Sequence, residues 1–206
     1  MVKVLQVVVG LCVLLGSATV AKADGAAVYA AQCVACHGAN GEGNLALSSP
    51  ALAGQSAEYL QRQLTNFSTG LRGTASGDST GAQMTAISST LSSDDMQGVA
   101  DYIAALPITP LLGEPASGDV KQGEKLYQSY CGSCHGSDAK GNDALHSPNL
   151  TLLSNSYLNS QYDKFLNGQR GYEKADKFGR QMGFMARAVT DPEQLKAITA
   201  YIHSLR

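Results

Sequence analysis

The feature that most constrains this chain is an internal duplication. Sliding the sequence over itself by 98 residues aligns the two halves without a gap for about seventy positions. The matched pairs include Gly25 and Gly123, Tyr29 and Tyr127, Cys33 and Cys131, Cys36 and Cys134, His37 and His135, and Pro50 and Pro148. Self-similarity at a fixed offset predicts two copies of one fold in tandem.

The length of the chain agrees with this division, because 206 residues suffice for two domains of about 100 residues each. We expect the first domain at residues 24–106 and the second at residues 120–206. The segment between them, 107–119, contains several Pro and Gly residues, which is typical of a linker.

Residues 1–23 precede the duplicated part. A lysine near the start is followed by an apolar run, and Ala21-Lys22-Ala23 offers small residues at the two positions that a signal peptidase reads. We therefore expect a signal peptide that is cleaved after Ala23, which removes Cys12 and places the protein in the periplasm. An uncleaved anchor and a lipidated Cys12 are the alternatives, but the run is short for a membrane span of about 20 residues.

Each repeat has the periodicity of amphipathic helices, and strand-like alternation is absent. The apolar spacing predicts a helix at the start of each repeat, a second helix over 56–67 in the first repeat, and a helix that ends each repeat. The last helix is expected to start at Ser92 or Ser93 in the first repeat, and Thr190 and Glu193 fit a capping box in the second. Both repeats are predicted to be all-α with long loops.

The strongest chemical signal is Cys-x-x-Cys-His, which occurs as CVACH at 33–37 and as CGSCH at 131–135. Thiols one helical turn apart can each add across one vinyl group of a haem, and the next residue then lies beneath the porphyrin with a ring nitrogen directed at the iron. The motif is typical of covalent c-type haem attachment, so we expect two haem c groups. The predicted attachment residues are Cys33, Cys36, Cys131 and Cys134, and the predicted iron ligands beside them are His37 and His135.

Paired cysteines have two other common uses in proteins. Four thiolates can bind zinc, and a Cys-x-x-Cys pair can serve as a redox dithiol. Zinc does not require a histidine after each pair, and the two pairs lie in separate repeats. A redox dithiol usually belongs to a βαβ unit, and the sequence predicts none. Haem attachment is therefore the favoured interpretation.

The ligand on the other side of each iron is expected to be a methionine. Met84 and Met182 occupy equivalent places in the two repeats, and each follows a glutamine. Met96 lies on the apolar face of the last helix and is expected in the core, and Met185 aligns with Ile87 and is expected to pack near the haem. We therefore predict Met84 and Met182 as axial ligands, which gives relatively positive potentials.

Several other residues have two interpretations each. Pro50 and Pro148 follow the histidines, where a backbone carbonyl could accept the second imidazole N–H or the proline could simply break the loop. Arg72 and Arg170 could pair with haem propionates or lie on the solvated surface. The remaining histidines lack histidine counterparts in the first repeat and are expected on the surface; they are His146 and His203.

The mature chain resembles the cytochrome c4 family, which consists of exported dihaem cytochromes built from two class I cytochrome c domains. The resemblance rests on both CxxCHG motifs, the Gly/Tyr pair before each, the loop proline, and the segments YLQRQLTNFSTGLRG and QMTAISSTLSSDDMQGVADYIAAL. It implies that Gly25 and Tyr29 contact Val99 and Tyr102, and that Gly123 and Tyr127 contact Ile198 and Tyr201. It also implies two haems that face each other across the domain interface.

The resemblance implies a soluble or membrane-associated periplasmic carrier. Such carriers take electrons from an upstream dehydrogenase or a quinol–cytochrome c reductase and pass them to a terminal oxidase or reductase. The alternative is an electron-transfer subunit or catalytic component of a dihaem oxidoreductase, for example in thiosulfate or sulfide oxidation. Two methionines in equivalent places favour the carrier, because an iron with both axial positions filled offers no catalytic site.

The charge of the chain limits the kinds of partner that are expected. The chain has no basic run, so a nucleic-acid partner is not expected. Without the first 23 residues it carries 13 basic and 17 acidic residues, and four haem propionates would make it more negative. A redox partner with a Lys- and Arg-rich contact surface is therefore expected, with reaction rates that fall as salt rises.

Overall fold

The computed structural model describes residues 24–109 and 117–206, and within them the secondary structure is helical. The elements of domain 1 are α1 (Gly25–Gln32), α2 (Val34–His37), η1 (Leu45–Leu47), α3 (Ala57–Ser68), α4 (Ser79–Ser88) and α5 (Ser93–Ala104). Those of domain 2 are α6 (Val120–Tyr130), α7 (Gly132–His135), η2 (Asp143–Leu145), α8 (Asn155–Leu166), α9 (Lys177–Ala186) and α10 (Pro192–Ser204). The expected signal peptide and the middle of the expected linker lie outside the described residues.

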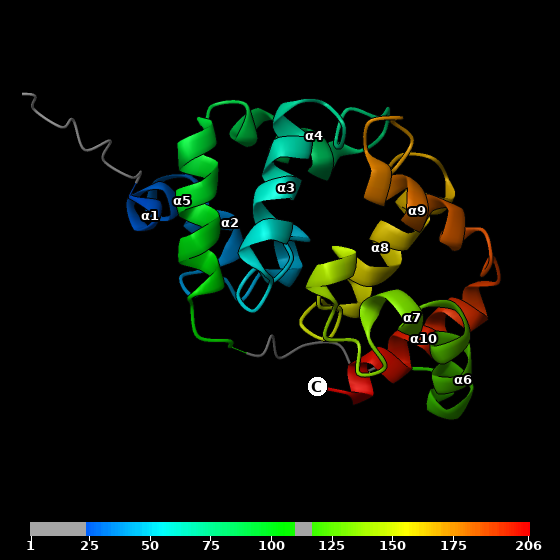
Figure 1. The fold of residues 1–206 in the computed structure, drawn as a ribbon. Helices are drawn as coiled ribbons and strands as arrows, with labels where there is room; N and C mark the ends of the chain where they lie inside the picture. Colours follow the sequence, from blue (N-terminus) through cyan, green and yellow to red (C-terminus); the bar gives the residue numbers. More distant parts are fainter. Residues whose placement is uncertain (1–23, 110–116) are drawn as a thin grey trace, which may run out of the picture.

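The two domains repeat one helix order, as the duplication predicts. They lie next to each other with α3 and α8 toward the middle of the molecule (Figure 1). Each has its own core, one around Tyr29, Val99 and Ile103 and the other around Tyr127 and Ile198. The all-α prediction is therefore confirmed. Among the described residues, no helix is long and apolar enough to cross a membrane.

The first and last helices of each domain cross at a glycine. A Cβ atom on Gly25 would lie 2.0 Å from the backbone oxygen of Gly98 in α5, and one on Gly123 would lie 1.9 Å from that of Ala197 in α10. Only a residue without a side chain allows the backbones to approach so closely. Next to each crossing two tyrosine rings pack, at 5.6 Å for Tyr29 and Tyr102 and at 5.4 Å in domain 2. The contacts that the resemblance implied are confirmed.

This crossing gives a prediction about stability. We expect Gly25→Ala to lower the free energy of unfolding of domain 1 by about 1–3 kcal/mol, because the added methyl group must push two packed backbones apart. Thermal unfolding of the haem-loaded protein measures the loss. Gly132→Ala is the control, because its Cβ would closely approach the flexible end of Gln128 and would make only an ordinary contact, at 3.6 Å, with the ring of Tyr127. Equal melting temperatures for Gly25→Ala and the wild type would refute the close crossing.

The caps of the last helices differ between the domains. Ser92 caps α5, and a capping box with Asp95 is present. In α10 the N-cap is Asp191, whose side chain accepts a hydrogen bond from the backbone N–H of Glu193, and Pro192 occupies the first turn. The capping box predicted for Thr190 and Glu193 is therefore wrong. A proline fits the first helical position because its missing N–H would have no partner there.

Candidate functional site

Each Cys-x-x-Cys-His motif forms a tight helical turn. α1 ends before Cys33, and α2 begins after it, so this cysteine stands at the junction of the two helices. The backbone N–H groups of Cys36 and His37 both donate to the carbonyl of Cys33, at 3.2 and 2.9 Å. Domain 2 repeats these bonds around Cys131, at 3.1 and 3.0 Å. The turn holds both thiols and the histidine of a motif within one short segment.

The four thiols in the described residues form no disulfide. Burial, with a smaller contribution from Cys36, raises the pKa of Cys33 to about 11, and burial raises that of Cys131 to about 12. A redox-active or metal-binding cysteine needs the thiolate and usually has a lowered pKa. These two sites instead favour the thiol, which is the form that adds across a vinyl group.

The histidine of each motif is held by the loop that follows it. The Nδ1 atom of His37 lies 3.0 Å from the backbone oxygen of Pro50, and that of His135 lies 3.1 Å from that of Pro148. A carbonyl oxygen can only accept, so each Nδ1 carries the proton and donates it, and the Nε2 lone pair is left for a metal. Burial lowers the pKa of both histidines, although the hydrogen bond to the proline carbonyl opposes it. Of the two interpretations of Pro50 and Pro148, the structure supports the one in which their carbonyls accept the imidazole N–H.

A cavity joins the predicted site residues of domain 1. Cys33, Cys36, His37 and Met84 all line it. Most of the remaining wall is apolar and comes from the loop before α3, from α3, α4 and α5, and from the segment between α4 and α5. Its apolar residues include Leu52, Leu60, Leu64, Phe67, Ile87, Leu91, Val99 and Ile103. Domain 2 adds Leu153, Tyr157, Gln161 and Lys164 at the domain boundary. An apolar chamber with thiols and a histidine together fits a porphyrin.

The predicted methionine ligands lie on two helices that the sequence did not predict. Met84 lies on α4 and Met182 on α9, and both side chains are half-buried. An aspartate caps each helix, Asp78 for α4 and Asp176 for α9, and each accepts a hydrogen bond from the backbone N–H of a glycine. α4 packs on α3, and α9 packs on α8. Met96 is buried in α5, as predicted for a core residue.

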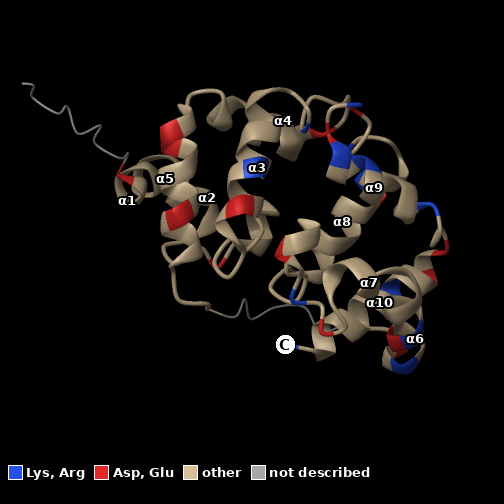
Figure 2. Ribbon diagram, in the orientation of Figure 1, with Lys and Arg blue, Asp and Glu red and all other residues tan. Residues whose placement is uncertain are grey.

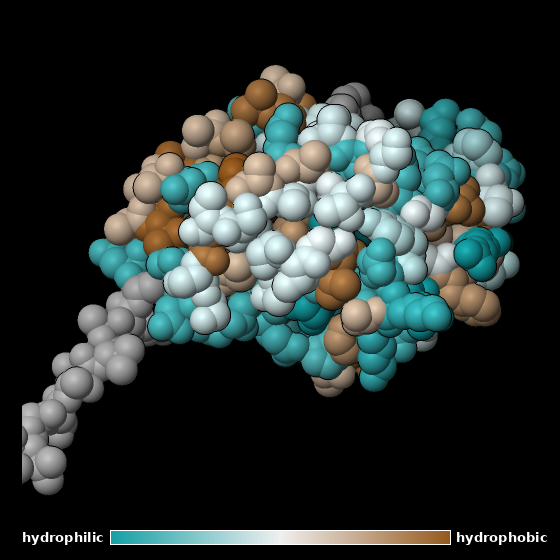
Figure 3. Space-filling model, turned by 90° about the horizontal axis from the view of Figure 1, so that it is seen from above, coloured by the Kyte–Doolittle hydropathy of each residue, from teal (hydrophilic) through white to brown (hydrophobic). Residues whose placement is uncertain are grey.

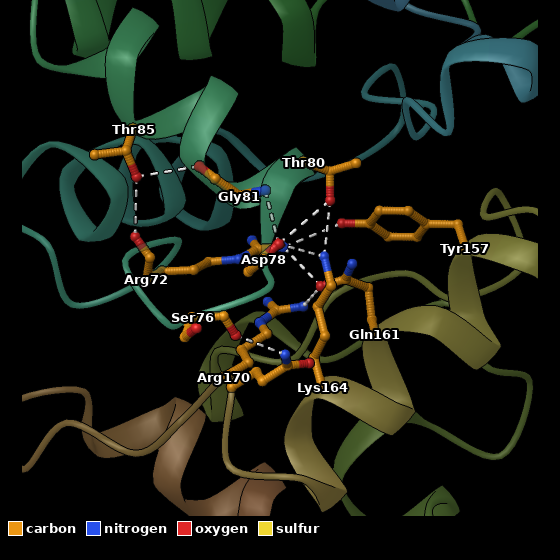
Figure 4. Close-up of polar contacts among 11 residues, drawn as sticks. Arg72, Ser76, Asp78, Thr80, Gly81, Thr85, Tyr157, Gln161, Lys164 and Arg170 are labelled. Atoms are coloured by element: carbon orange, nitrogen blue, oxygen red, sulfur yellow. Dashed lines mark hydrogen bonds and ion pairs between the residues drawn. The ribbon is translucent and has the colours of Figure 1, made fainter.

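The domain interface is built around two buried arginines. Arg72 and Arg170 are 6% and 9% exposed, which overturns the alternative of a solvated surface position. Arg72 donates to Gln63 in its own domain at 2.7 Å and to Tyr157 and Gln161 across the interface at 3.2 and 2.9 Å. Arg170 mirrors it, with bonds of 2.9 Å to Gln161 and 3.1 Å to Gln63. Figure 4 shows Arg72 and Arg170 near Tyr157 and Gln161.

Neither arginine forms an ion pair with a carboxylate within the described residues, although the charge of Arg72 helps to lower the pKa of Asp78. Within the part of the chain that the structure describes, every acceptor bonded to Arg72 or Arg170 is a neutral amide or hydroxyl. Burial, together with the charge of Arg72, lowers the pKa of Arg170. Buried charges in proteins are normally paired with an opposite charge. The site therefore fits an anionic group, and the propionates of a haem in the adjoining cavity are such groups.

Further polar contacts join the domains. Lys164 on α8 donates to the cap residue Asp78 at 2.6 Å and to Thr80 at 2.8 Å (Figure 4). Burial alone would raise the pKa of Asp78, but the hydrogen bond from Lys164 holds this pKa below its usual value. His146, which was expected on the surface, bonds Glu58 of domain 1 and lies 4.2 Å from the ring of Phe178. His146 is therefore a half-exposed residue at the edge of the interface, with a partner in domain 1 that the sequence did not indicate.

Comparison with known proteins agrees with the site. The Cytochrome c family model matches residues 22–107 and 120–206. The chain belongs to the cytochrome c family. It is 31% identical to the cbb3-type cytochrome c oxidase subunit FixP of Azorhizobium caulinodans over 91% of this chain, but it spans only 60% of that relative. It is 30% identical to the thiosulfate dehydrogenase electron acceptor of Stutzerimonas stutzeri, over 93% of this chain and 91% of the relative.

A solved structure shows the same tandem arrangement. The cytochrome c4 of Acidithiobacillus ferrooxidans matches with a TM-score of 0.70 and 28% identity, over 84% of this chain and 99% of that chain. Within its family the chain is thus a dihaem cytochrome c of the cytochrome c4 type. Its two domains bind two covalent haem c groups.

Proposed function

We propose that this protein is a periplasmic electron carrier in which each haem iron is held between a histidine and a methionine. The observation that carries the proposal is the cavity of domain 1, where Met84 lines the same chamber as Cys33, Cys36 and His37. The proposed attachment residues are Cys33, Cys36, Cys131 and Cys134. The proposed ligand pairs are His37 with Met84 and His135 with Met182.

The chain's own residues have distinct roles in this proposal. When bound, each haem supplies an iron that cycles between the ferric and ferrous states. The proline carbonyls fix the imidazole rings so that Nε2 is available to the iron. A methionine thioether favours ferrous iron and so raises the potential. Arg72 and Arg170 would hold propionates at the interface, where water is largely excluded.

We infer the domain limits and the cellular site from the sequence. Cleavage after Ala23 would leave a first domain at 24–106, a linker at 107–119 and a second domain at 120–206, in the periplasm. The proposed partners are redox proteins: an upstream dehydrogenase or quinol–cytochrome c reductase and a terminal oxidase or reductase. The names of the relatives, an oxidase subunit and a dehydrogenase electron acceptor, support partners of these kinds.

The ligand assignment is tested by Met84→Ala and Met182→Ala. We expect each variant to lose one methionine–iron absorption band and to lower one of two midpoint potentials by on the order of 100 mV or more, because an axial thioether favours ferrous iron. Visible spectra with redox titration measure both. Met185→Ala is the control for α9 and should keep both bands. If Met185→Ala rather than Met182→Ala loses a band, the ligand of domain 2 is Met185.

A second function is favoured by the relatives alone. The similarity to a thiosulfate dehydrogenase electron acceptor and to an oxidase subunit suits a redox subunit of a larger enzyme. A catalytic iron needs a free or easily vacated position. The reduced wild-type protein should therefore bind carbon monoxide at neither iron if it is a carrier. Ready binding at both irons, or oxidation of thiosulfate by the purified chain, would favour the enzyme.

A further inference from the structure

The charge of the chain is divided unequally between its domains. Residues 24–106 contain two basic and seven acidic residues, whereas residues 120–206 contain eleven basic and eight acidic residues. Both basic residues of domain 1, Arg62 and Arg72, bond to domain 2, so they are engaged at the interface. Figure 2 shows acidic residues on α5 of domain 1 and basic residues on α9 of domain 2. Although the net charge of the whole chain is small, domain 1 is negatively charged and domain 2 is positively charged.

The basic residues of α9 form a stripe on its outer face. Lys177, Arg180, Phe184 and Arg187 follow one another at i, i+3, i+7 and i+10, which places them on one side of a helix. All four are exposed, and Phe184 has 73% of its surface accessible. Met182 lies toward the opposite, inner side and is half-buried. The stripe is thus separated from the proposed iron ligand by the width of a single helix.

Nothing within the described residues neutralises the stripe. None of Lys177, Arg180 and Arg187 forms an ion pair in the part of the chain that the structure describes, although Lys177 lies 5.5 Å above the ring of Phe178. Phe184 leaves most of its apolar surface exposed among these charged side chains. Seen from above, hydrophilic side chains dominate the domain 2 end of the molecule, with separate apolar patches among them (Figure 3).

The duplication supplies an internal comparison. Domain 1 has the same helix, α4, and needs the same haem pocket, but its residues at the four stripe positions are small and uncharged. In the order of the stripe they are Ser79, Ala82, Ala86 and Ser89. Folding and haem binding therefore do not require three cations and a phenylalanine on this face. The stripe is a property of domain 2 alone.

We infer that the outer face of α9 is a docking surface for a redox partner with an acidic contact surface. That electrons pass through this contact rests on the proposed function. That a partner binds at this face is argued from the stripe alone. Three unpaired cations would meet carboxylates of the partner, and Phe184 would lose its exposed apolar area at the centre of the contact. The acidic surface of domain 1 is then left for a partner of opposite charge. A carrier of this design meets two different partners through two different domains.

The occupant is a separate protein and not a second copy of this chain. Domain 1 of a second copy is acidic, but its acidic residues are spread over the N-caps of α1 and α4, the helices α3 and α5, and a loop. A partner with carboxylates clustered around an apolar contact fits the compact stripe better. Long-range attraction of this kind raises association rates at low ionic strength.

The test uses the full-length dihaem protein and plastocyanin, a blue-copper protein with an acidic surface patch, as the probe. The stripe variant carries Lys177→Ser, Arg180→Ala and Arg187→Ser, which introduces the residues of domain 1. The control variant carries Lys121→Ala, Lys125→Ala and Lys196→Gln on α6 and α10, so it removes the same charge elsewhere in domain 2. Stopped-flow rates of electron transfer and the affinity of the complex are measured between 10 and 500 mM ionic strength.

We expect the wild-type rate to fall as salt rises, and the stripe variant to be about tenfold slower at 10 mM and about equal to the wild type at 500 mM. The control variant should be slowed less than about threefold. Phe184→Ala should weaken binding at every salt concentration, since its contribution is apolar. Unchanged visible spectra show that the variants are folded.

Three results would overturn the inference. One is equal slowing by the stripe and control variants, because net charge alone would then explain the rates. Another is a wild-type rate that does not depend on salt. The third is a salt-dependent dimer of the wild type that the stripe variant abolishes, which would assign the face to a second copy. Oxidation of the wild type by hexacyanoferrate(III) tests the carrier proposal separately, because it needs no docking surface.

Discussion

A chain that carries Cys33→Ala and Cys36→Ala is expected to mature with one covalently bound haem instead of two. No other thiol of domain 1 lines its cavity, so the first porphyrin would have no thioether bond. The apolar chamber would lose its covalent occupant, and domain 1 would unfold well below the wild-type temperature, because a large cavity is strongly destabilising. The haem content per chain, and the colour that remains after extraction with acidified organic solvent, measure the result.

The mirror variant gives the matched control for this prediction. Cys131→Ala with Cys134→Ala should also leave one haem, but now in domain 1, so the two variants should each keep a different one of the two midpoint potentials. Two covalent haems in either double variant would contradict the assignment of the attachment residues. Complete loss of both haems in one variant would show that maturation of one domain depends on the other.

Much of this fold could be predicted from the sequence because residues that the fold requires occur at equivalent positions in both repeats. Gly25 and Gly123 recur in register because two helices cross at the same close distance in both domains. The position of each loop proline left two interpretations, an acceptor carbonyl at the imidazole or a break in the loop, and the structure shows the hydrogen bond in both domains. Each of these contacts lies within a single domain. It joins residues that occur in the same order and at the same spacing in both repeats.

The helices that carry the methionines were not predicted, and their composition explains why. α4 reads STGAQMTAIS, in which small polar and small apolar residues alternate without a clear apolar stripe. Glycine also lowers the helix propensity of such a segment. A signal was present in the caps, because Asp78 and Asp176 occupy equivalent positions just before each helix.

The interface between the domains could not be derived from either repeat alone. His146 has no histidine counterpart in domain 1, and nothing near it in the sequence indicates that Glu58 is its partner. Lys164 aligns with Asn66, so its bond to Asp78 is also absent from the other domain. Such contacts depend on how the two domains are placed, which hydrophobic periodicity does not specify.

The interface arginines provide the second large expected effect. We expect Arg170→Gln, and equally Arg72→Gln, to lower the midpoint potentials by on the order of 100 mV. Hydrogen bonds to charged groups contribute about 1.5–3 kcal/mol, and a tenfold change in a one-electron equilibrium, about 1.4 kcal/mol, is about 59 mV. The sign follows from charge. A buried cation near the haem stabilises the ferrous state over the more positive ferric state, so its removal favours oxidation.

The conservative variants separate charge from geometry. Arg72→Lys and Arg170→Lys keep the positive charge but lose the planar fork that bonds Gln63 and Gln161 together. If charge dominates, the lysine variants should keep most of the wild-type potentials while the contact between the domains weakens, which thermal unfolding would report as two separate transitions. If the lysine and glutamine variants lower the potentials equally, the guanidinium groups act by positioning the interface. Unchanged potentials in all four variants would show that Arg72 and Arg170 do not bind the propionates, and their buried charge would then need another anion.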